Sequence, residues 1–173
     1  MDKSARKRIL AVIPARGGSK RLVRKNIRML AGKTLIEYAL DCASHCCDIT
    51  DIVCASDSDE ILQCANQYFS KSVARVNSYV IKLPECLTLD NSLLTPVIRY
   101  CIDGLELRNS GTAIDTVVLL QPTSPFRHKT DLSKAISLHK TSGKDVVSVS
   151  LIPSTLEKLL YVDESGFIHK LTS

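Results

Sequence analysis

Short, continuous apolar runs alternate along the chain with longer blocks in which apolar residues recur every three or four positions. Runs bounded by Pro, Gly or short polar residues predict strands that are buried on both faces of a sheet. The wider spacing predicts amphipathic helices. The runs cover residues 8–13, 51–55, 115–120 and 145–151, and the periodic blocks cover 35–47, 61–69, 93–105 and 132–139. This alternation predicts a three-layer α/β domain, doubly wound around a mostly parallel sheet.

Polar residues mark where several of these helices begin. Thr34 is followed three residues later by Glu37, a spacing typical of a capping box. Asp57 is expected to cap the second helix, because short polar side chains accept hydrogen bonds from the first free amides of a helix. Thr130 is expected to cap the last helix for the same reason.

Two further segments are less regular. Residues 71–90 carry only a weak strand signal, around 74–76. Residues 159–171 predict a hairpin that turns at 163–166, because two alternating apolar arms flank an acidic, glycine-containing turn.

The composition indicates an ordinary globular protein in a reducing compartment. A chain of 173 residues with 45% hydrophobic residues can bury a substantial core, so we expect one domain over residues 1–173. The seven cysteines are odd in number and form no CxxC pair, which favours free thiols over disulfides or zinc ligands. No apolar run approaches the ~20 residues that span a bilayer, and the basic N-terminus lacks the apolar core of a signal peptide. We therefore expect a cytoplasmic protein without a membrane partner.

Positive charge is concentrated near the N-terminus. Residues 1–33 hold eleven of the 23 Lys and Arg residues but only one of the 18 Asp and Glu residues. Such an excess suggests a site for a phosphorylated small molecule, nucleic acid or an acidic lipid surface, with a solvated basic face as the alternative. The basic block lacks the interleaved aromatic residues that stack on bases, so we do not expect nucleic acid as a partner.

The end of the first predicted strand has the residues that an anion site needs. Ligands of doubly wound folds bind at the carboxyl ends of the strands. Gly17 and Gly18 allow the backbone to approach a ligand closely, and Arg16, Lys20 and Lys25 supply charge beside the exposed amides. The spacing fits neither GxxxxGK[ST] nor GxGxxG, and a purely structural glycine turn is the alternative.

Two segments resemble the signature motifs of the cytidylyltransferases that make CMP-sialic acids. One is ARGGSKRLVRKN, residues 15–26, and the other is LLQPTSPFR, residues 119–127. The resemblance runs from about Ile9 to the end of the chain. It implies a Rossmann-like nucleotidyltransferase fold and transfer of CMP from CTP to the anomeric hydroxyl of an acidic nine-carbon sugar. Pyrophosphate would be released, and Mg²⁺ would be the cofactor.

The resemblance also assigns roles to residues of both motifs. Three cations are the expected catalytic residues, namely Arg16, Lys20 and Lys25. The expected nucleotide-binding residues are Ala15, Arg16, Gly17, Gly18, Ser19, Lys20, Lys25 and Asn26. The expected sugar-binding residues are Gln121, Thr123, Ser124 and Arg127. For Arg127, a solvated or helix-capping cation is an equal alternative.

Several departures from the family pattern bear on activity. Val23 stands where a proline is usual, while Leu83 and Leu94 replace an arginine and a hydroxyl residue, which leaves recognition of the base undefined. The aspartates that would bind Mg²⁺ and the dimerisation segment would lie beyond Ser173, so the metal ligands are unknown. We therefore expect the chain alone to be weakly active or inactive, and its partner to be a second copy or a complementing C-terminal chain. A nucleotide-binding remnant of the family is the alternative to an enzyme, and the acidic sugar itself is undetermined.

Overall fold

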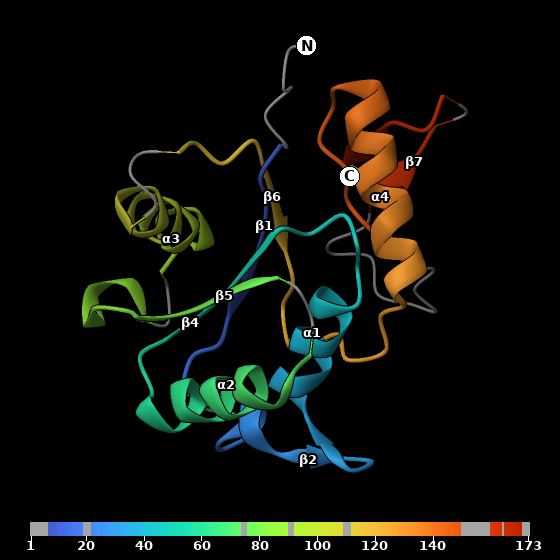
Figure 1. Cartoon of the computed structure of the whole chain (residues 1–173). Helices are drawn as coiled ribbons and strands as arrows, with labels where there is room; N and C mark the ends of the chain where they lie inside the picture. Colours follow the sequence, from blue (N-terminus) through green and yellow to red (C-terminus); the bar gives the residue numbers. More distant parts are fainter. Residues whose placement is uncertain are drawn as a thin grey trace.

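The chain folds around a four-stranded parallel sheet with helices on both faces (Figure 1). A computed structural model describes residues 7–18, 22–73, 76–89, 92–108, 112–149, 160–163 and 165–170. The strands lie in the order β5-β4-β1-β6. They are β1 (Ile9–Pro14), β4 (Asp51–Ser56), β5 (Asn77–Lys82) and β6 (Thr116–Leu119).

The two central strands are the most apolar, as expected for strands covered on both faces. Five of the six residues of β1 and all six of β4 are buried. Val12 of β1 lies opposite Val53 of β4 on one side and opposite Leu119 of β6 on the other. The strands predicted at 8–13, 51–55 and 115–120 are confirmed, with shifts of a residue or two at their ends.

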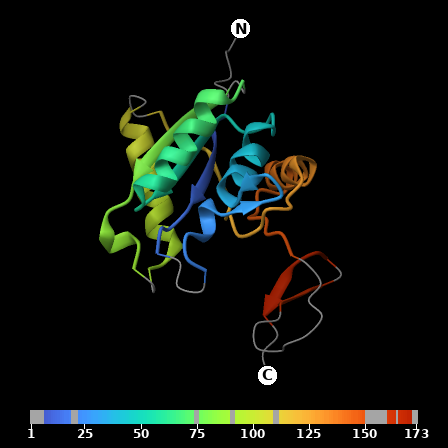
Figure 2. The ribbon, with the colours of Figure 1, turned by 90° about the horizontal axis from the view of Figure 1, so that it is seen from below.

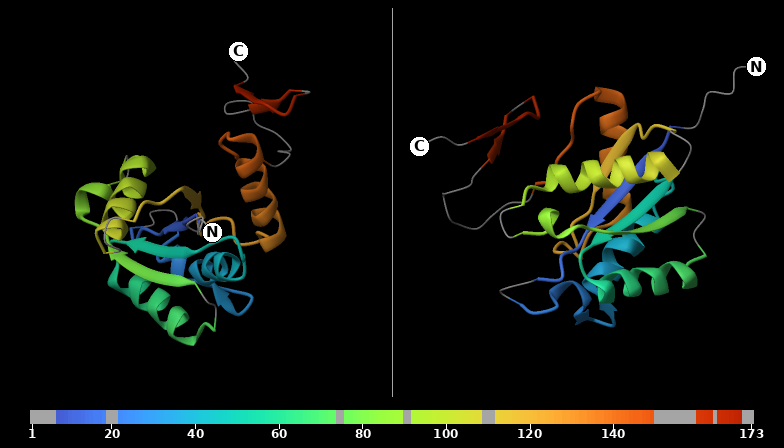
Figure 3. Two further views of the ribbon diagram at one scale, coloured as in Figure 1. Left: turned by 45° about the horizontal axis from the view of Figure 1, so that its top comes forward. Right: turned by 90° about the vertical axis from the view of Figure 1, so that its left-hand side faces the viewer.

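Helices cover the two faces of the sheet unequally (Figure 3). One face packs against α1 (Leu35–Ser44), α2 (Asp59–Lys71) and α4 (Lys129–Ser142), and the other packs against α3 (Leu94–Arg108). After β5 the chain crosses by α3 to the opposite side of β1, so the direction of winding reverses between β1 and β6. The predicted doubly wound, three-layer α/β fold is confirmed. In such a fold this reversal point is where a ligand is expected.

Of the three predicted helix caps, the one at Thr34 is confirmed and the one at Thr130 is wrong, while Asp57 is described with the site below. Thr34 Oγ1 accepts a hydrogen bond from the Glu37 amide at 3.2 Å, and Glu37 Oε2 accepts one from the Thr34 amide at 2.7 Å. Helix α4 begins at Lys129, with His128 as its N-cap residue and no side-chain cap hydrogen bond. Thr130 therefore lies inside the first turn and cannot cap it.

Two strand predictions also need correction. The strand expected around 74–76 begins instead at Asn77, beyond Val76, and residues 74 and 75 lie outside the described part. Residues 145–149 form no strand, and Val147 and Val149 are 63% and 57% exposed. Their β-branched side chains favour extended backbone, but a strand also requires a neighbour to hydrogen-bond, and none of the described strands pairs with this segment.

Two hairpins accompany the sheet. In the first, β2 (Met29–Leu30) pairs with β3 (Lys33–Thr34) across Ala31 and Gly32, both at positive φ (47° and 88°). This is the left-handed two-residue turn that suits the twist of paired strands. In the second, β7 (Leu160–Val162) pairs with β8 (Ile168–Lys170), which confirms the predicted hairpin. It stands apart from the sheet, on the side of α4 (Figures 2 and 3).

A buried ion pair anchors the amino-terminal ends of the central strands. Arg8 Nη2 lies 2.9 Å from Asp51 Oδ1, and Asp51 also accepts hydrogen bonds from Thr50 and Asn77. Burial raises the pKa of the Asp51 carboxyl, but the hydrogen bonds from Arg8, Thr50 and Asn77 outweigh it and hold the pKa below its ordinary value. The ionised form is therefore the one the fold stabilises.

The seven cysteines are free thiols, as predicted. Cys54 and Cys101 are fully buried, whereas Cys47 and Cys86 are exposed. Burial raises the pKa of Cys101 to about 12 and raises that of Cys54 as well. Among the described helices, none combines the length and apolar character needed to cross a bilayer.

Candidate functional site

A cavity of about 580 Å³ lies at the carboxyl ends of β1 and β6, where the winding of the sheet reverses. Three segments line it. They are the loop after β1 with the 3₁₀ helix η1 (Lys25–Ile27), the region between β5 and the start of α3, and the segment after β6. The lining residues are Pro14, Ala15, Arg16, Gly18, Leu22, Lys25, Asn26, Leu83, Leu87, Ser92, Leu93, Leu94, Val97, Gln121, Pro122 and Thr123.

The loop after β1 is attached to the turn between β4 and α2. The Gly17 amide donates a hydrogen bond to Asp57 Oδ1 at 2.7 Å, and the Ala15 amide donates one to the Ala55 carbonyl at 2.9 Å. A Cβ on Gly17 would lie 2.8 Å from the Cβ of Ser58, so only glycine fits this close approach. The prediction that Asp57 caps α2 is wrong. Ser58 is the N-cap residue, and the Asp57 carboxylate binds the glycine loop instead.

These attachments limit which predicted nucleotide ligands can contact an anion. The amides of Ala15 and Gly17 are already used within the protein. Gly18 lines the cavity, and no atom lies within 4 Å of where its Cβ would stand. Among the described residues, the Gly18 backbone therefore has open space beside it for a ligand.

Asn26 lines the cavity and also holds the loop after β1 in place. It is 6% exposed, and its Nδ2 donates a hydrogen bond to the Arg16 carbonyl at 2.9 Å. This bond closes the loop between Arg16 and η1, so the Asn26 amide holds the loop in shape. Its neighbour Lys25 also lines the cavity, and its predicted role as a phosphate ligand stays a prediction.

The Arg16 side chain reaches across the mouth of the cavity. Its Nη1 donates to the Leu89 carbonyl at 2.8 Å and lies 3.5 Å from the Thr88 carbonyl. The guanidinium thus bridges the loop after β1 and the segment that follows β5. Its hydrogen-bond acceptors there are neutral peptide oxygens. Farther along the loop, Arg24 forms an ion pair with Glu60 of α2.

The remaining predicted residues divide between the cavity and other places. Gln121 and Thr123 line it, whereas Ser124 and Arg127 do not. Burial raises the pKa of Cys42 in α1, and the positive charge of nearby Arg127 opposes that rise. The Nη1 of Arg127 is buried without a hydrogen-bond partner among the described residues. Ser19 and Lys20 lie outside the described residues.

One wall of the cavity is apolar, and the motifs did not predict most of it. Leu87, Leu93 and Val97 join Leu83 and Leu94 there, with Ser92 at its edge. Leu93 is 74% exposed although it adjoins α3, whose Val97, Cys101 and Leu105 are buried in the core. Leu93 lies outside the positions of α3 that face the core. An exposed apolar residue at such a position is the sequence signal that could have revealed this wall.

The charge of the lining is wholly positive within the part of the chain that the structure describes. Arg16 and Lys25 contribute cations, and no carboxylate appears among the lining residues. The described residues also hold no group of three His, Cys, Asp or Glu side chains suited to a metal ion. Mg²⁺ prefers carboxylate oxygens, so the side chains around this cavity do not fit a protein-held magnesium site.

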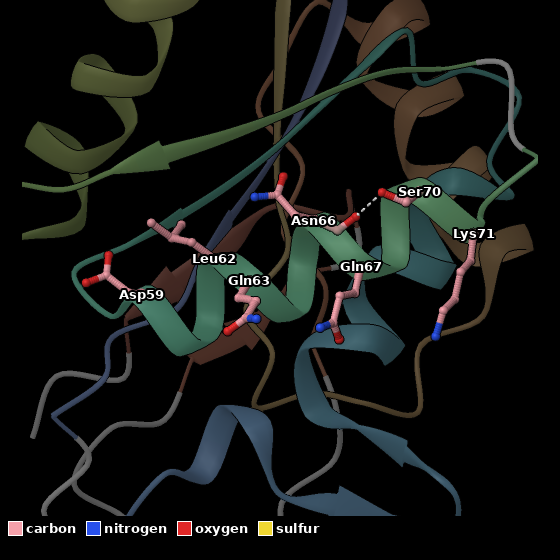
Figure 4. Close-up of a pocket in the computed structure, with 7 residues that line it drawn as sticks. All are labelled: Asp59, Leu62, Gln63, Asn66, Gln67, Ser70 and Lys71. Atoms are coloured by element: carbon pink, nitrogen blue, oxygen red, sulfur yellow. Dashed lines mark hydrogen bonds between the residues drawn. The ribbon is translucent and has the colours of Figure 1, made fainter.

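A second depression follows the outer face of α2 (Figure 4). Its lining residues are Asp59, Leu62, Gln63, Asn66, Gln67, Ser70 and Lys71. All seven come from one helix, and the Ser70 hydroxyl donates its hydrogen bond to the backbone carbonyl of Asn66. Ligand sites in α/β folds are built by loops that converge from several elements, so this surface is not a comparable candidate.

Comparisons with known proteins agree with this geometry. The family model described as cytidylyltransferase matches residues 10–165. The chain is 43% identical over 166 residues to a CMP-N,N'-diacetyllegionaminic acid synthase of Legionella pneumophila, covering 94% of the chain and 66% of that relative. It is 32% identical over 149 residues to an N-acylneuraminate cytidylyltransferase of Escherichia coli, covering 86% of the chain and 32% of that protein. The chain thus spans less than two thirds of the length of each relative.

The fold has solved counterparts as well. A crystal structure of 4-diphosphocytidyl-2C-methyl-D-erythritol synthase superposes with a TM-score of 0.64, over 98% of this chain and 70% of that one. The sequences are 16% identical, so the match concerns the fold alone.

Proposed function

The chain belongs to the cytidylyltransferase family, and from that premise we propose that it transfers CMP from CTP to an acidic sugar of the sialic-acid type. The observation that carries the proposal is the cavity at the reversal point of the sheet. Arg16 and Lys25 line the side nearest the glycine loop, and Gln121 and Thr123 line the side nearest β6. Both motif segments thus meet in one place although they are about a hundred residues apart in sequence.

The charge of the cavity suits the proposed nucleotide. CTP brings several negative charges, and each charge-assisted hydrogen bond to phosphate contributes about 1.5–3 kcal/mol in a favourable site. Arg16, Lys25 and the Gly18 backbone are the described groups available for the triphosphate. The amide of Gln121 and the hydroxyl of Thr123 can bind a sugar's carboxylate and hydroxyl oxygens.

The proposed reaction is an in-line substitution at the α-phosphorus. The anomeric oxygen of the sugar attacks, the bond from the α-phosphorus to the bridging oxygen breaks, and pyrophosphate leaves. The proton of the sugar hydroxyl passes to solvent. The residues of this chain orient the two substrates and stabilise the charge on the phosphates, which are the main contributions a protein makes in such a transfer. Because the described residues do not fit a magnesium site, we assign no step to the metal.

For the sugar we propose a nine-carbon keto acid. The relatives named above act, by their names, on N,N'-diacetyllegionaminic acid and on N-acylneuraminate. The first is the more similar in sequence, so it is the first substrate to test. A single domain, a cytoplasmic location, and assembly with a second copy or a complementing chain stay predictions.

The test is a turnover assay on the purified 173-residue chain. CTP and Mg²⁺ are combined separately with N-acetylneuraminate, N,N'-diacetyllegionaminate and pseudaminate, and release of pyrophosphate is measured with formation of the CMP-sugar. Because the chain alone is expected to be at most weakly active, we expect slow product formation with at least one of them, and a further loss of at least tenfold in kcat/KM for Lys25→Ala. CTP binding without product from any sugar would instead identify the chain as a nucleotide-binding form of the family. A chain that does not bind CTP would refute the proposal.

A further inference from the structure

The turn between β4 and α2, residues 57–58, and the first residues of α2 hold the glycine loop at two points. Near the start of the loop, the Gly17 amide donates to Asp57 Oδ1 at 2.7 Å. Farther along, Arg24 forms its ion pair with Glu60. The cavity-lining residues Arg16 and Gly18 flank the first of these points directly. The position of this turn therefore sets where the anion-binding part of the loop stands.

We propose that Asp57 is a positioning residue for triphosphate binding, and that it acts through its hydrogen bond to the Gly17 amide. This inference rests on the proposed function. By holding Gly17 against the turn, the carboxylate fixes the backbone between Arg16 and Gly18. Without that bond the Gly17-Gly18 segment can adopt many conformations. Ligand binding must then order it, and the conformational entropy lost in doing so weakens the affinity.

The negative charge of Asp57 does not itself favour binding of a triphosphate. A carboxylate close to a bound triphosphate repels it, so an acid here would weaken binding if its charge acted on the ligand. The hydrogen bond to the Gly17 amide therefore accounts for an acidic residue at this position, because a carboxylate is a strong acceptor for a backbone amide. The close approach of Gly17 to Ser58 supports this, since a Cβ at Gly17 would stand 2.8 Å from the Ser58 Cβ and lift the loop from the turn.

Substitutions at Asp57 separate the hydrogen bond from the charge. Asp57→Ala removes the acceptor, and we expect CTP and inorganic tripolyphosphate to bind about tenfold more weakly in calorimetric titration. Asp57→Asn keeps an acceptor oxygen and removes the charge, and we expect affinity to return to within about threefold of the unaltered chain, or to exceed it. Asp59→Asn is the matched control, because that carboxylate lies two residues away, at the start of α2, and pairs with Lys82 at the surface. It should leave the affinity unchanged.

A double-mutant cycle tests whether Asp57 acts through Gly17. Gly17→Ala should weaken CTP binding by itself, and its combination with Asp57→Ala should cost little more than either change alone. Thermal unfolding followed by circular dichroism checks that each variant remains folded.

The outcomes distinguish this inference from the proposed function. Equal CTP affinity in Asp57→Ala and the unaltered chain would overturn the inference and leave the function in place. Asp57→Asn as weak as Asp57→Ala, or full additivity with Gly17→Ala, would overturn it too. If the unaltered chain binds neither CTP nor tripolyphosphate, the function fails and the inference fails with it.

Discussion

Substituting Asn26 should destabilise the protein although the residue belongs to a motif expected to bind nucleotide. Its side chain is 6% exposed, and its amide nitrogen supplies the hydrogen bond to the Arg16 carbonyl at 2.9 Å. Asn26→Ala removes the donor and leaves that carbonyl without its partner inside the loop. A lost hydrogen bond of this kind costs about 1–3 kcal/mol, and a small cavity adds to it.

The expected total is about 2 kcal/mol, which lowers the ratio of folded to unfolded protein more than tenfold. Urea denaturation followed by circular dichroism measures it as a lower midpoint at unchanged slope. Asn26→Asp has nearly the same size but presents an oxygen to the carbonyl oxygen, so it should be at least as destabilising at neutral pH. Lys25→Ala is the matched control. Its side chain lines the cavity, so stability should change by less than about 0.5 kcal/mol while CTP binding weakens.

An Asn26→Ala protein with an unchanged urea midpoint would refute this reasoning. It would mean that the loop keeps its shape without the bond. A fall in both stability and CTP affinity is the result expected from a residue that shapes the loop.

Three further predictions follow from buried and strained groups. Because the folded-state pKa of Asp51 is lowered, its ion pair with Arg8 stabilises the fold above the unfolded pKa of about 4 and loses that contribution as pH falls through the folded pKa. Urea midpoints between pH 7 and pH 3 should therefore fall more steeply for the unaltered chain than for Asp51→Asn, which should itself be less stable by about 3–5 kcal/mol at pH 7. Iodoacetamide under native conditions should alkylate exposed Cys47 within minutes and spare Cys101, whose pKa burial raises to about 12; equal labelling in mass spectrometry would contradict this. Ala31→Asn should increase the free energy of unfolding by about 0.5–1 kcal/mol, because Asn tolerates the positive φ of this turn better than Ala. The melting temperature should rise slightly, and a lower one would contradict the prediction.

The sheet could be predicted where apolar character alone decides the structure. Strands β1 and β4 are covered on both faces, so their sequences are continuous apolar runs, and Thr34 with Glu37 marks the start of α1 locally. Strand β5 was expected only weakly and a few residues too early. Its sequence NSYVIK begins with exposed polar residues and has only a short apolar run, which gives a weak signal. Residues 145–149 gave the opposite error, because β-branched side chains alone do not provide a pairing partner.

The site was predictable at the level of segments and less so at the level of side chains. The motifs located the cavity, and Arg16, Lys25, Gln121 and Thr123 all line it. The role of Asp57 was wrong, because its hydrogen-bond partner is forty residues away in sequence and a local cap signal cannot reveal it. Side-chain roles in this loop depend on tertiary contacts, which short sequence patterns do not contain.

The way Arg16 is held has a consequence for the kinetics of encounter. Its guanidinium hydrogen-bonds to the peptide oxygens of Leu89 and Thr88, which carry no formal charge to cancel its own. Among the described residues Arg16 has no ion-pair partner, so an arriving anion displaces peptide dipoles there. The positive charge also attracts anions from a distance, until dissolved salt screens it over about 8 Å at physiological ionic strength. Association should consequently slow as salt rises, while the dissociation rate changes far less.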